Sequence, residues 1–234
     1  MSETETSVAR RDKKAPASER SDEPYVLPLW AIRLLRAVLR LIFRLLWRIR
    51  YVGVENVPAS GGVIIAANHQ TYLDPFWLGG RVPLYSRFLA WDKTFDWPLA
   101  GKLMRLLGAW PLQQKGDRRA FRRSLQWLRG GGALVIFPEG GRSLSDGRMQ
   151  EFKVGAARLA LEAKVPILPI TIRGGHRVWP RDWRRPRLGR VEIIYHPLHH
   201  LSPQPGEDTR QTASRETGRL YEIIHSALEP KAEG

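Results

Sequence analysis

Six short apolar runs, separated by amphipathic stretches, constrain the fold of this 234-residue chain more than any other feature. Each run is apolar at successive positions, which is typical of a strand buried on both faces of a sheet. The runs span residues 62–68, 87–91, 109–112, 133–138, 165–172 and 191–195. The stretches with a helical pattern are 94–107, 117–129, 152–163 and 208–228. This order predicts a single α/β domain whose mixed or mostly parallel sheet is covered by helices.

The composition is consistent with one such domain and limits its chemistry. The chain is 43% hydrophobic, which is enough for one sizeable core. It contains no cysteine, which excludes disulfides and thiolate metal sites and fits a reducing cytoplasm. Its formal net charge of +15 favours an anionic partner, which can be nucleic acid, anionic lipid or a phosphorylated small molecule.

The first 50 residues differ in character from the predicted domain, which we place at 51–234. Residues 1–27 are predicted to be a disordered tail, because the first 24 carry many charges of both signs and no aromatic side chain. Residues 28–50 predict an amphipathic helix with leucines over most of its surface and arginines on one face. The arginines, three or four positions apart, are Arg33, Arg36, Arg40, Arg44 and Arg48.

This arginine stripe argues against a helix that crosses a bilayer, because charges at the bilayer centre are costly. A helix lying in the membrane interface fits better, with its leucines among the acyl chains and its arginines at the lipid phosphates. The alternative is a helix that packs on the domain and has a solvated basic face. We therefore expect a peripheral or monotopic protein at the cytoplasmic face of the cell membrane, with anionic lipid as a partner.

A histidine and an aspartate follow the first apolar run closely. Asn68 ends the run, His69 comes next, and Asp74-Pro75 is predicted to begin a helix with the aspartate as N-cap. Across such a turn the carboxylate can reach the imidazole, hold one tautomer and stabilise the protonated ring. The pair provides a base and its orienting group without a nucleophile, so the reacting hydroxyl can belong to the substrate. The alternative is a helix cap beside an ordinary turn histidine.

A polar, glycine-rich turn follows the fourth apolar run. Glu139, Arg142 and Ser143 lie in it, together with the pair Gly140-Gly141. Ligands of open α/β sheets bind where the strands end. Arg142 can grip a phosphate through its fork of donors, and the glycines let the backbone approach a ligand closely. The alternative is a surface turn with a solvated Arg–Glu pair.

Taken together, NHQTYLD (68–74) and FPEGGRS (137–143) resemble the glycerolipid acyltransferases, the family of the 1-acyl-sn-glycerol-3-phosphate acyltransferases. Weaker similarity at 93–117, 152–160 and 165–174 extends the resemblance over roughly 51–196. It implies transfer of a fatty acyl group from acyl-CoA or acyl carrier protein to the free hydroxyl of a lysophospholipid. The first choice of acceptor is 1-acyl-sn-glycerol-3-phosphate, which would give phosphatidate; the alternative is another lysolipid or an aminolipid.

The resemblance also implies residue roles. His69 is the expected general base, oriented by Asp74, and no metal or cofactor is required. Arg142 is expected on the acceptor phosphate, and backbone amides of the glycine-rich turn can face the oxyanion. Gln114 stands where many members of the family carry an arginine, so either a neighbouring cation replaces it or this contact with the acceptor is altered. The implied substrate-binding residues are Asn68, Lys115, Arg118, Glu139, Gly140, Gly141, Arg142 and Ser143.

Two further features bear on function. Residues 172–190 contain seven arginines and two tryptophans, which fits a membrane interface, coenzyme A phosphates or a solvated loop. His199-His200 is interpreted as a surface pair, because no carboxylate or cysteine is near it in the sequence. Nucleic acid is not expected as a partner, because no binding module is recognisable. A lipid hydrolase is not expected either, because Ser143 does not lie in a G-x-S-x-G turn.

Overall fold

A computed structural model of the chain describes residues 28–83, 86–98, 100–106, 108–113 and 117–228. The predicted tail, residues 1–27, lies outside the described residues, and so do Gln114 and Lys115.

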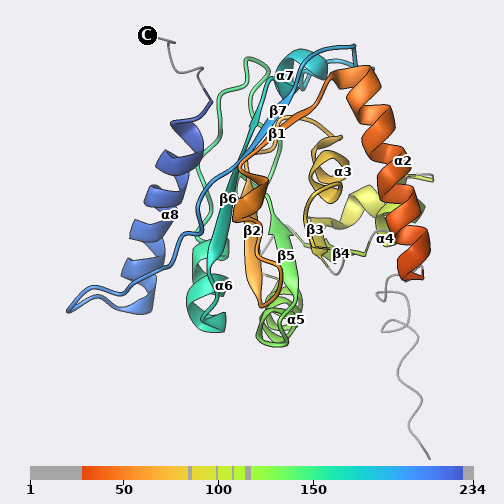
Figure 1. Ribbon diagram of the computed structural model, residues 1–234. Coiled ribbons are helices and arrows are strands. Elements are labelled where there is room, and N and C mark those ends of the chain that lie inside the picture. The colour runs from red at the N-terminus through yellow and green to blue at the C-terminus, as the bar shows by residue number, and fades with distance from the viewer. Residues whose placement is uncertain (1–27, 84–85, 99, 107, 114–116, 229–234) are drawn as a thin grey trace, which may run out of the picture.

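A seven-stranded sheet occupies the centre of the domain, with the order β1-β7-β6-β2-β5-β3-β4 (Figure 1). All neighbouring strands are parallel except β6 and β7, which are antiparallel. The prediction of a mixed, mostly parallel sheet is therefore confirmed. The strands are β1 (Arg50–Val52), β2 (Val63–Ala67), β3 (Arg87–Trp91), β4 (Ala109–Leu112), β5 (Ala133–Ile136), β6 (Ile167–Arg173) and β7 (Glu192–Tyr195).

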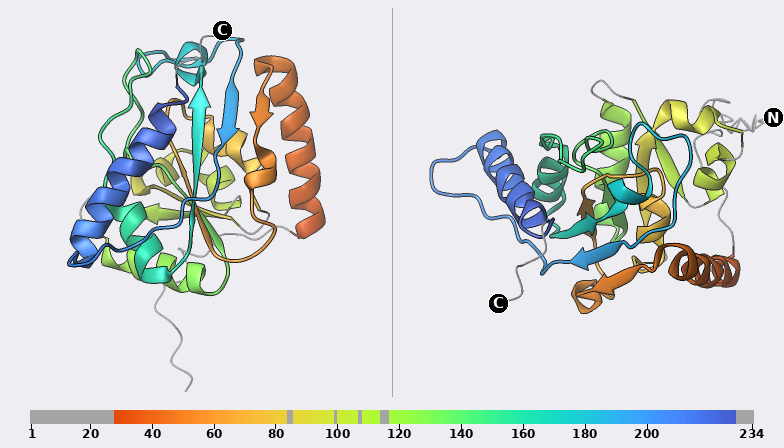
Figure 2. Two further views of the ribbon diagram at one scale, coloured as in Figure 1. Left: turned by 60° about the vertical axis from the view of Figure 1, so that its left-hand side comes forward. Right: turned by 90° about the horizontal axis from the view of Figure 1, so that it is seen from above.

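Helices cover both faces of this sheet (Figures 1 and 2). Consecutive residues of β2 point into different cores: Val63, Ile65 and Ala67 into one, Ile64 and Ala66 into the other. The first core includes α2, α3 and α4, and the second includes α5, α6 and α8. The helices are α2 (Leu29–Trp47), η1 (Val54–Asn56), α3 (Asp74–Gly79), η2 (Asp92–Asp96), α4 (Ala100–Leu106), α5 (Arg118–Arg129), α6 (Gly155–Ala163), α7 (Gly175–Val178) and α8 (Thr209–His225).

The helix expected at 94–107 is two short helices, η2 and α4. Between them Trp97 is extended, with φ −73° and ψ 126°. Pro98 follows it, and a proline disfavours the helical conformation of the residue before it. The local apolar pattern indicated a helix, but the proline divides it.

The N-terminal helix α2 packs on the domain with part of its arginine stripe. Phe43 and Trp47 are buried in the first core. Arg36 Nη1 donates to Val82 O at 2.8 Å, and Arg40 Nη1 donates to Gly80 O at 3.4 Å. Burial, and to a lesser extent the charge of Arg40, lowers the pKa of Arg36 to about 10. These two arginines therefore face the domain, and their expected place at lipid phosphates is wrong.

The opposite side of α2 exposes its large apolar side chains. They are Trp30, Leu34, Val38, Leu41, Ile42, Leu45 and Leu46, with exposed fractions from 40% to 71%. The alternative of a docked helix with a solvated basic face is thus correct in the docking and correct only in part for the face. Arg33, Arg44 and Arg48 are exposed, but the solvated surface of the helix is also broadly apolar. Among the described residues, no helix is long and apolar enough to span a membrane.

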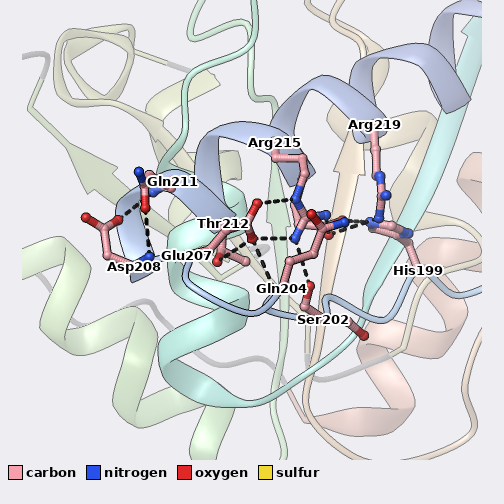
Figure 3. Close-up of polar contacts among 10 residues, drawn as sticks. His199, Ser202, Gln204, Glu207, Asp208, Gln211, Thr212, Arg215 and Arg219 are labelled. Carbon is pink, nitrogen blue, oxygen red and sulfur yellow. Dashed lines mark hydrogen bonds and ion pairs between the residues drawn. The ribbon is translucent and has the colours of Figure 1, made fainter.

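The structure also corrects the interpretation of His199-His200. His199 forms a backbone bridge with Ile167, the first residue of β6, and its Nε2 lies 2.7 Å from Glu216 Oε2 (Figure 3). The Glu216 side chain is 1% exposed and comes from α8. His199 is therefore one half of a partly buried ion pair, whereas His200 is exposed.

Candidate active site

The predicted catalytic pair lies directly after β2, at the edge of the sheet where the parallel strands β2, β5 and β6 all end. Asn68 is fully buried there. Its Nδ2 donates to Ile172 O at 2.9 Å, and its Oδ1 accepts from Ile172 N at 2.7 Å. These bonds tie the start of the turn to β6. They give Asn68 a positioning role, and its expected contact with substrate stays a prediction.

His69 and Asp74 are hydrogen-bonded across this turn. His69 Nδ1 lies 2.9 Å from Asp74 Oδ2. The Asp74 side chain is fully buried, whereas that of His69 is 18% exposed. In the tautomer that donates from Nδ1 to the carboxylate, Nε2 carries the free lone pair. No described residue bonds Nε2, so this atom can accept a proton from a ligand at the open edge of the sheet.

Asp74 is the first residue of α3 and not its cap, so the expected N-cap is wrong by one position: Leu73 is the N-cap. The Asp74 carboxylate turns back toward the preceding residues. Its Oδ2 accepts from Thr71 N at 2.8 Å, and its Oδ1 accepts from Thr71 Oγ1 at 2.7 Å. The two bonds from Thr71 and the one with His69 Nδ1 thus fix the carboxylate beside the imidazole. The first turn of α3 supplies only the backbone that carries Asp74.

The glycine-rich turn after β5 holds the main chain of His69 from both sides. Glu139 Oε1 accepts from His69 N at 2.7 Å, and Ser143 N donates to His69 O at 2.6 Å. The Phe137 ring stacks on the imidazole, with centroids 4.2 Å apart. The two sequence motifs therefore form one unit, in which the second supports the histidine supplied by the first.

Glu139 lies inside this unit. It is 4% exposed, and its carboxylate also accepts from Ser143 Oγ at 2.9 Å and from Gln150 N at 2.8 Å. Burial raises the pKa of Glu139, although its hydrogen bonds from Gln150, His69 and Ser143 oppose this shift. Ser143 is 1% exposed and donates its hydroxyl to Glu139. Both residues position His69, and their expected contacts with the acceptor stay predictions.

Gly140 has a physical reason to be glycine. Its φ of +68° lies in the left-handed region, and a Cβ there would come within 2.4 Å of Lys153 Nζ. Its N–H donates to Phe137 O at 3.0 Å, so that amide is not available to an oxyanion. Gly141 has more room, with Gln150 Nε2 at 3.5 Å from a Cβ built there.

Arg142 lies apart from Glu139, so the alternative of a solvated Arg–Glu pair is wrong. Its guanidinium carbon lies 3.9 Å from the centroid of the Tyr72 ring, and its Nη2 donates to Arg181 O at 3.0 Å. Its Nη1 is buried and has no hydrogen-bond partner among the described residues. A buried, unsatisfied guanidinium donor is costly unless an oxyanion occupies the space beside it.

Sequence reasoning missed the aromatic cluster around Arg142. The Tyr72 ring contacts Trp97 and Trp179, with centroids 5.4 Å and 5.5 Å away. Tyr72 lies between His69 and Asp74 in the sequence, which was the only local signal, whereas the two tryptophans come from distant segments. Arg118 is the first residue of α5 and is exposed, and no described contact connects it with these side chains.

Within the described residues, no group of three or more histidine, aspartate or glutamate side chains is arranged to hold a metal ion. The described site brings together one imidazole, one carboxylate bonded to it, a turn that supports its main chain and one arginine with an unbonded donor.

Comparisons with known proteins identify the family and the fold of the chain. Residues 48–173 match the protein family described as Acyltransferase. The chain is 31% identical over 159 residues to 1-acyl-sn-glycerol-3-phosphate acyltransferase LPAT1, chloroplastic, of Arabidopsis thaliana, covering 65% of this chain and 44% of that protein. It is 35% identical over 161 residues to a probable 1-acyl-sn-glycerol-3-phosphate acyltransferase of Mycoplasma pneumoniae, covering 62% and 59%.

The chain spans about half the length of the curated relatives that it matches. Among solved structures, the crystal structure of the 1-acyl-sn-glycerophosphate acyltransferase PlsC from Thermotoga maritima has the same fold. The TM-score is 0.69 and the sequence identity 24%, over 88% of this chain and 81% of that chain.

Proposed function

This chain belongs to the Acyltransferase family, and from that premise we propose that it transfers a fatty acyl group from a thioester donor to the free hydroxyl of a lysophospholipid. The donor is acyl-CoA or acyl carrier protein, and the first choice of acceptor is 1-acyl-sn-glycerol-3-phosphate, which gives phosphatidate. The observation that carries the proposal is the oriented base: His69 bonded to buried Asp74 through Nδ1, with Nε2 unbonded at the open edge.

In the proposed reaction, His69 Nε2 takes the proton of the acceptor hydroxyl while its oxygen attacks the thioester carbonyl carbon. Asp74 stabilises the imidazolium that results. The tetrahedral intermediate then collapses, the carbon–sulfur bond breaks, and the imidazolium returns its proton to the leaving thiolate. An ester and a free thiol are formed, and His69 is neutral again. Ser143 is not the nucleophile in this scheme, because its hydroxyl is buried and bonded to Glu139.

Arg142 is assigned to the acceptor phosphate. Its buried Nη1 lacks a partner among the residues that the structure describes, and two contacts, with Tyr72 and Arg181, hold the guanidinium in place. A lysine cannot reproduce a bidentate fork. We expect Arg142→Lys to raise the KM for the acceptor more than the KM for the donor. A defect confined to the KM for the donor would contradict the assignment.

Membrane attachment is part of the same proposal, because the acceptor and the product are both membrane lipids. The exposed apolar face of α2 enters the acyl region, while Arg33 and Arg44, both exposed, stay near the head groups. Arg36 and Arg40 fix the helix to the domain, so attachment also sets the height of the active site above the membrane. The protein would thus lie at the cytoplasmic face as a peripheral or monotopic protein that binds anionic lipid.

An assay of the purified chain in detergent tests the activity. One acyl-CoA is offered with a panel of lysolipids that differ in head group, and the preferred acceptor is then tested with acyl carrier protein as donor. We expect transfer to 1-acyl-sn-glycerol-3-phosphate. Transfer to none of the acceptors would contradict the proposal, and preference for another lysolipid or an aminolipid would support the alternative acceptor.

Membrane attachment has its own test. Leu41→Asp/Leu45→Asp removes apolar area from the exposed face of α2 without touching the docked side. We expect weaker flotation with both neutral and anionic vesicles and unchanged turnover in detergent. Tags at both ends of the chain should remain on the same side of sealed vesicles, and tags on opposite sides would contradict a peripheral helix.

A further inference from the structure

Residues 179–190, between α7 and β7, form a largely exposed loop at the end of the molecule where α7 lies (Figure 1). Five of its residues are arginines and one, Asp182, is acidic. Within the described residues, the Asp182 carboxylate does not pair with these arginines, because it accepts a hydrogen bond from Ser145 Oγ at 2.5 Å. No described acidic side chain contacts Arg184 or Arg185. The loop therefore presents an excess of positive charge that the domain itself does not balance.

Two contacts connect this loop with functional parts of the molecule. At one end, Arg187 O accepts from Trp47 Nε1 of α2 at 2.7 Å. At the other end, Arg181 and Arg142 exchange hydrogen bonds: Arg142 Nη2 donates to Arg181 O at 3.0 Å, and Arg181 Nη1 donates to Arg142 O at 3.3 Å. The same loop thus contacts the helix with the exposed apolar face and the arginine assigned to the acceptor phosphate.

The outward side chains of the loop combine charge with apolar surface. Leu188 is 73% exposed and Trp183 is 47% exposed. The Arg187 guanidinium lies over the Trp183 ring, 3.3 Å from its centroid. Tryptophan and arginine side by side are typical of the head-group level of a membrane. A site for a soluble phosphorylated donor gives no reason for a leucine that points into solvent, whereas a lipid surface does.

We propose that loop 179–190 is a second lipid-contacting surface, which binds anionic head groups and continues the surface of α2 toward the active site. Through Arg181 it holds Arg142 at the level where an acceptor phosphate lies. This inference rests on the proposed function, because a membrane-bound acceptor makes that position useful. The occupant is the anionic bilayer surface, and not coenzyme A or an acidic carrier protein.

Vesicle binding by the full-length chain tests the loop. The probes are phosphatidylcholine vesicles and vesicles that also contain phosphatidylglycerol. Arg184→Ala/Arg185→Ala is expected to bind the anionic vesicles about 30-fold more weakly, which corresponds to about 1 kcal/mol for each arginine. Its binding to neutral vesicles should change little. Leu188→Asp is expected to weaken binding to both kinds of vesicle several-fold, because it removes apolar contact.

The matched control is Lys164→Ala/Arg210→Ala. Both control residues are exposed, and the double change removes the same charge. Lys164 is the C-cap of α6, just before β6 begins, and Arg210 is in the first turn of α8. Both therefore lie toward the end of the strands that is opposite to His69. This control should bind anionic vesicles nearly as well as the unmodified chain. If the control and Arg184→Ala/Arg185→Ala bind equally well, the proposal is overturned.

Kinetics in detergent test whether the loop binds coenzyme A or acyl carrier protein instead of lipid. They also separate this inference from the proposed function. Arg184→Ala/Arg185→Ala should keep the KM for acyl-CoA and for acyl carrier protein, since no bilayer is present. An increase in either KM, with vesicle binding unchanged, would assign the loop to that donor and overturn the inference. If the unmodified chain transfers no acyl group, the proposed function fails, while the vesicle measurements still decide whether the loop binds lipid.

Discussion

Two histidine–carboxylate pairs lie at opposite ends of the sheet, and their distances alone do not tell them apart. His69 Nδ1 lies 2.9 Å from Asp74 Oδ2, and His199 Nε2 lies 2.7 Å from Glu216 Oε2. Both carboxylates are buried, and the imidazoles are 18% and 16% exposed. The pairs differ in their surroundings. Within the described residues, Asp74 receives its other hydrogen bonds from Thr71 alone, whereas Glu216 also contacts two arginines of α8 (Figure 3).

This difference decides what each histidine can do. The charge of Glu216 is already balanced by Arg215 and Arg219, so it stabilises an imidazolium less strongly. Its partner His199 also uses Nε2 for the pair itself. The charge of Asp74 has no described cationic partner other than a protonated His69, and Nε2 of His69 is left for a ligand. We therefore expect a general base at His69, where the carboxylate is otherwise uncompensated and the second ring nitrogen is open, and not at His199.

Removal of each imidazole gives the largest expected contrast. His69→Ala should lower kcat by a factor on the order of 10²–10⁴, the usual contribution of a general base. His199→Ala should leave kcat near that of the unmodified chain. Steady-state kinetics in detergent measure the effect, and thermal unfolding verifies that both variants are folded. Near-normal turnover of folded His69→Ala would contradict the mechanism.

Isosteric changes of the two carboxylates should give opposite effects. Asp74→Asn can hold the wrong tautomer of His69, so we expect kcat to fall about 100-fold or more. Glu216→Gln removes a buried charge that three side chains contact, so we expect the free energy of unfolding to fall by about 1–3 kcal/mol with kcat unchanged. Urea denaturation and kinetics on both variants measure this. Similar losses of activity in the two would remove the distinction between the pairs.

A smaller effect is expected at Glu139, which supports the main chain of His69. In Glu139→Gln, one carboxylate oxygen becomes an amide donor that faces either His69 N–H or Gln150 N–H, which are themselves donors. We expect kcat to fall about tenfold while the KM for the acceptor changes little. If only the KM for the acceptor rises, Glu139 contacts the acceptor, as the family resemblance implied.

The smallest expected effect comes from the hydroxyl that orients Asp74. Thr71→Val removes the hydrogen bond from Thr71 Oγ1 to Asp74 Oδ1 and leaves the one from Thr71 N. Loss of about 1 kcal/mol should lower kcat about fivefold. The matched control is Thr212→Val, which removes a hydroxyl bonded to Glu207 on the side of His199 and should leave kcat unchanged. Equal kinetics of the two variants would show that Thr71 does not orient the base.

Much of the fold could be predicted from the sequence, because its signals are local. The apolar run at 133–138 corresponds to β5, and the pattern at 117–129 corresponds to α5, which begins at Arg118 and ends at Arg129. The pair His69–Asp74 was also predictable, because only five positions and one turn separate the two residues. The missed strand β1 is three residues long, too short for its pattern to differ from the end of the helix before it.

The sequence by itself therefore determined six of the seven strands, the longer helices and the position of the His69–Asp74 pair, since each depends on the spacing of nearby residues. Only the tertiary structure decided which side of α2 faces the domain. An amphipathic pattern indicates that two faces differ, but the carbonyls of Gly80 and Val82 that bind its arginines belong to another segment. It likewise decided that Glu139 supports the backbone of His69, 70 positions away, and that Glu216 pairs with His199. Buried polar groups must find hydrogen-bond partners wherever folding brings them, and those partners are non-local.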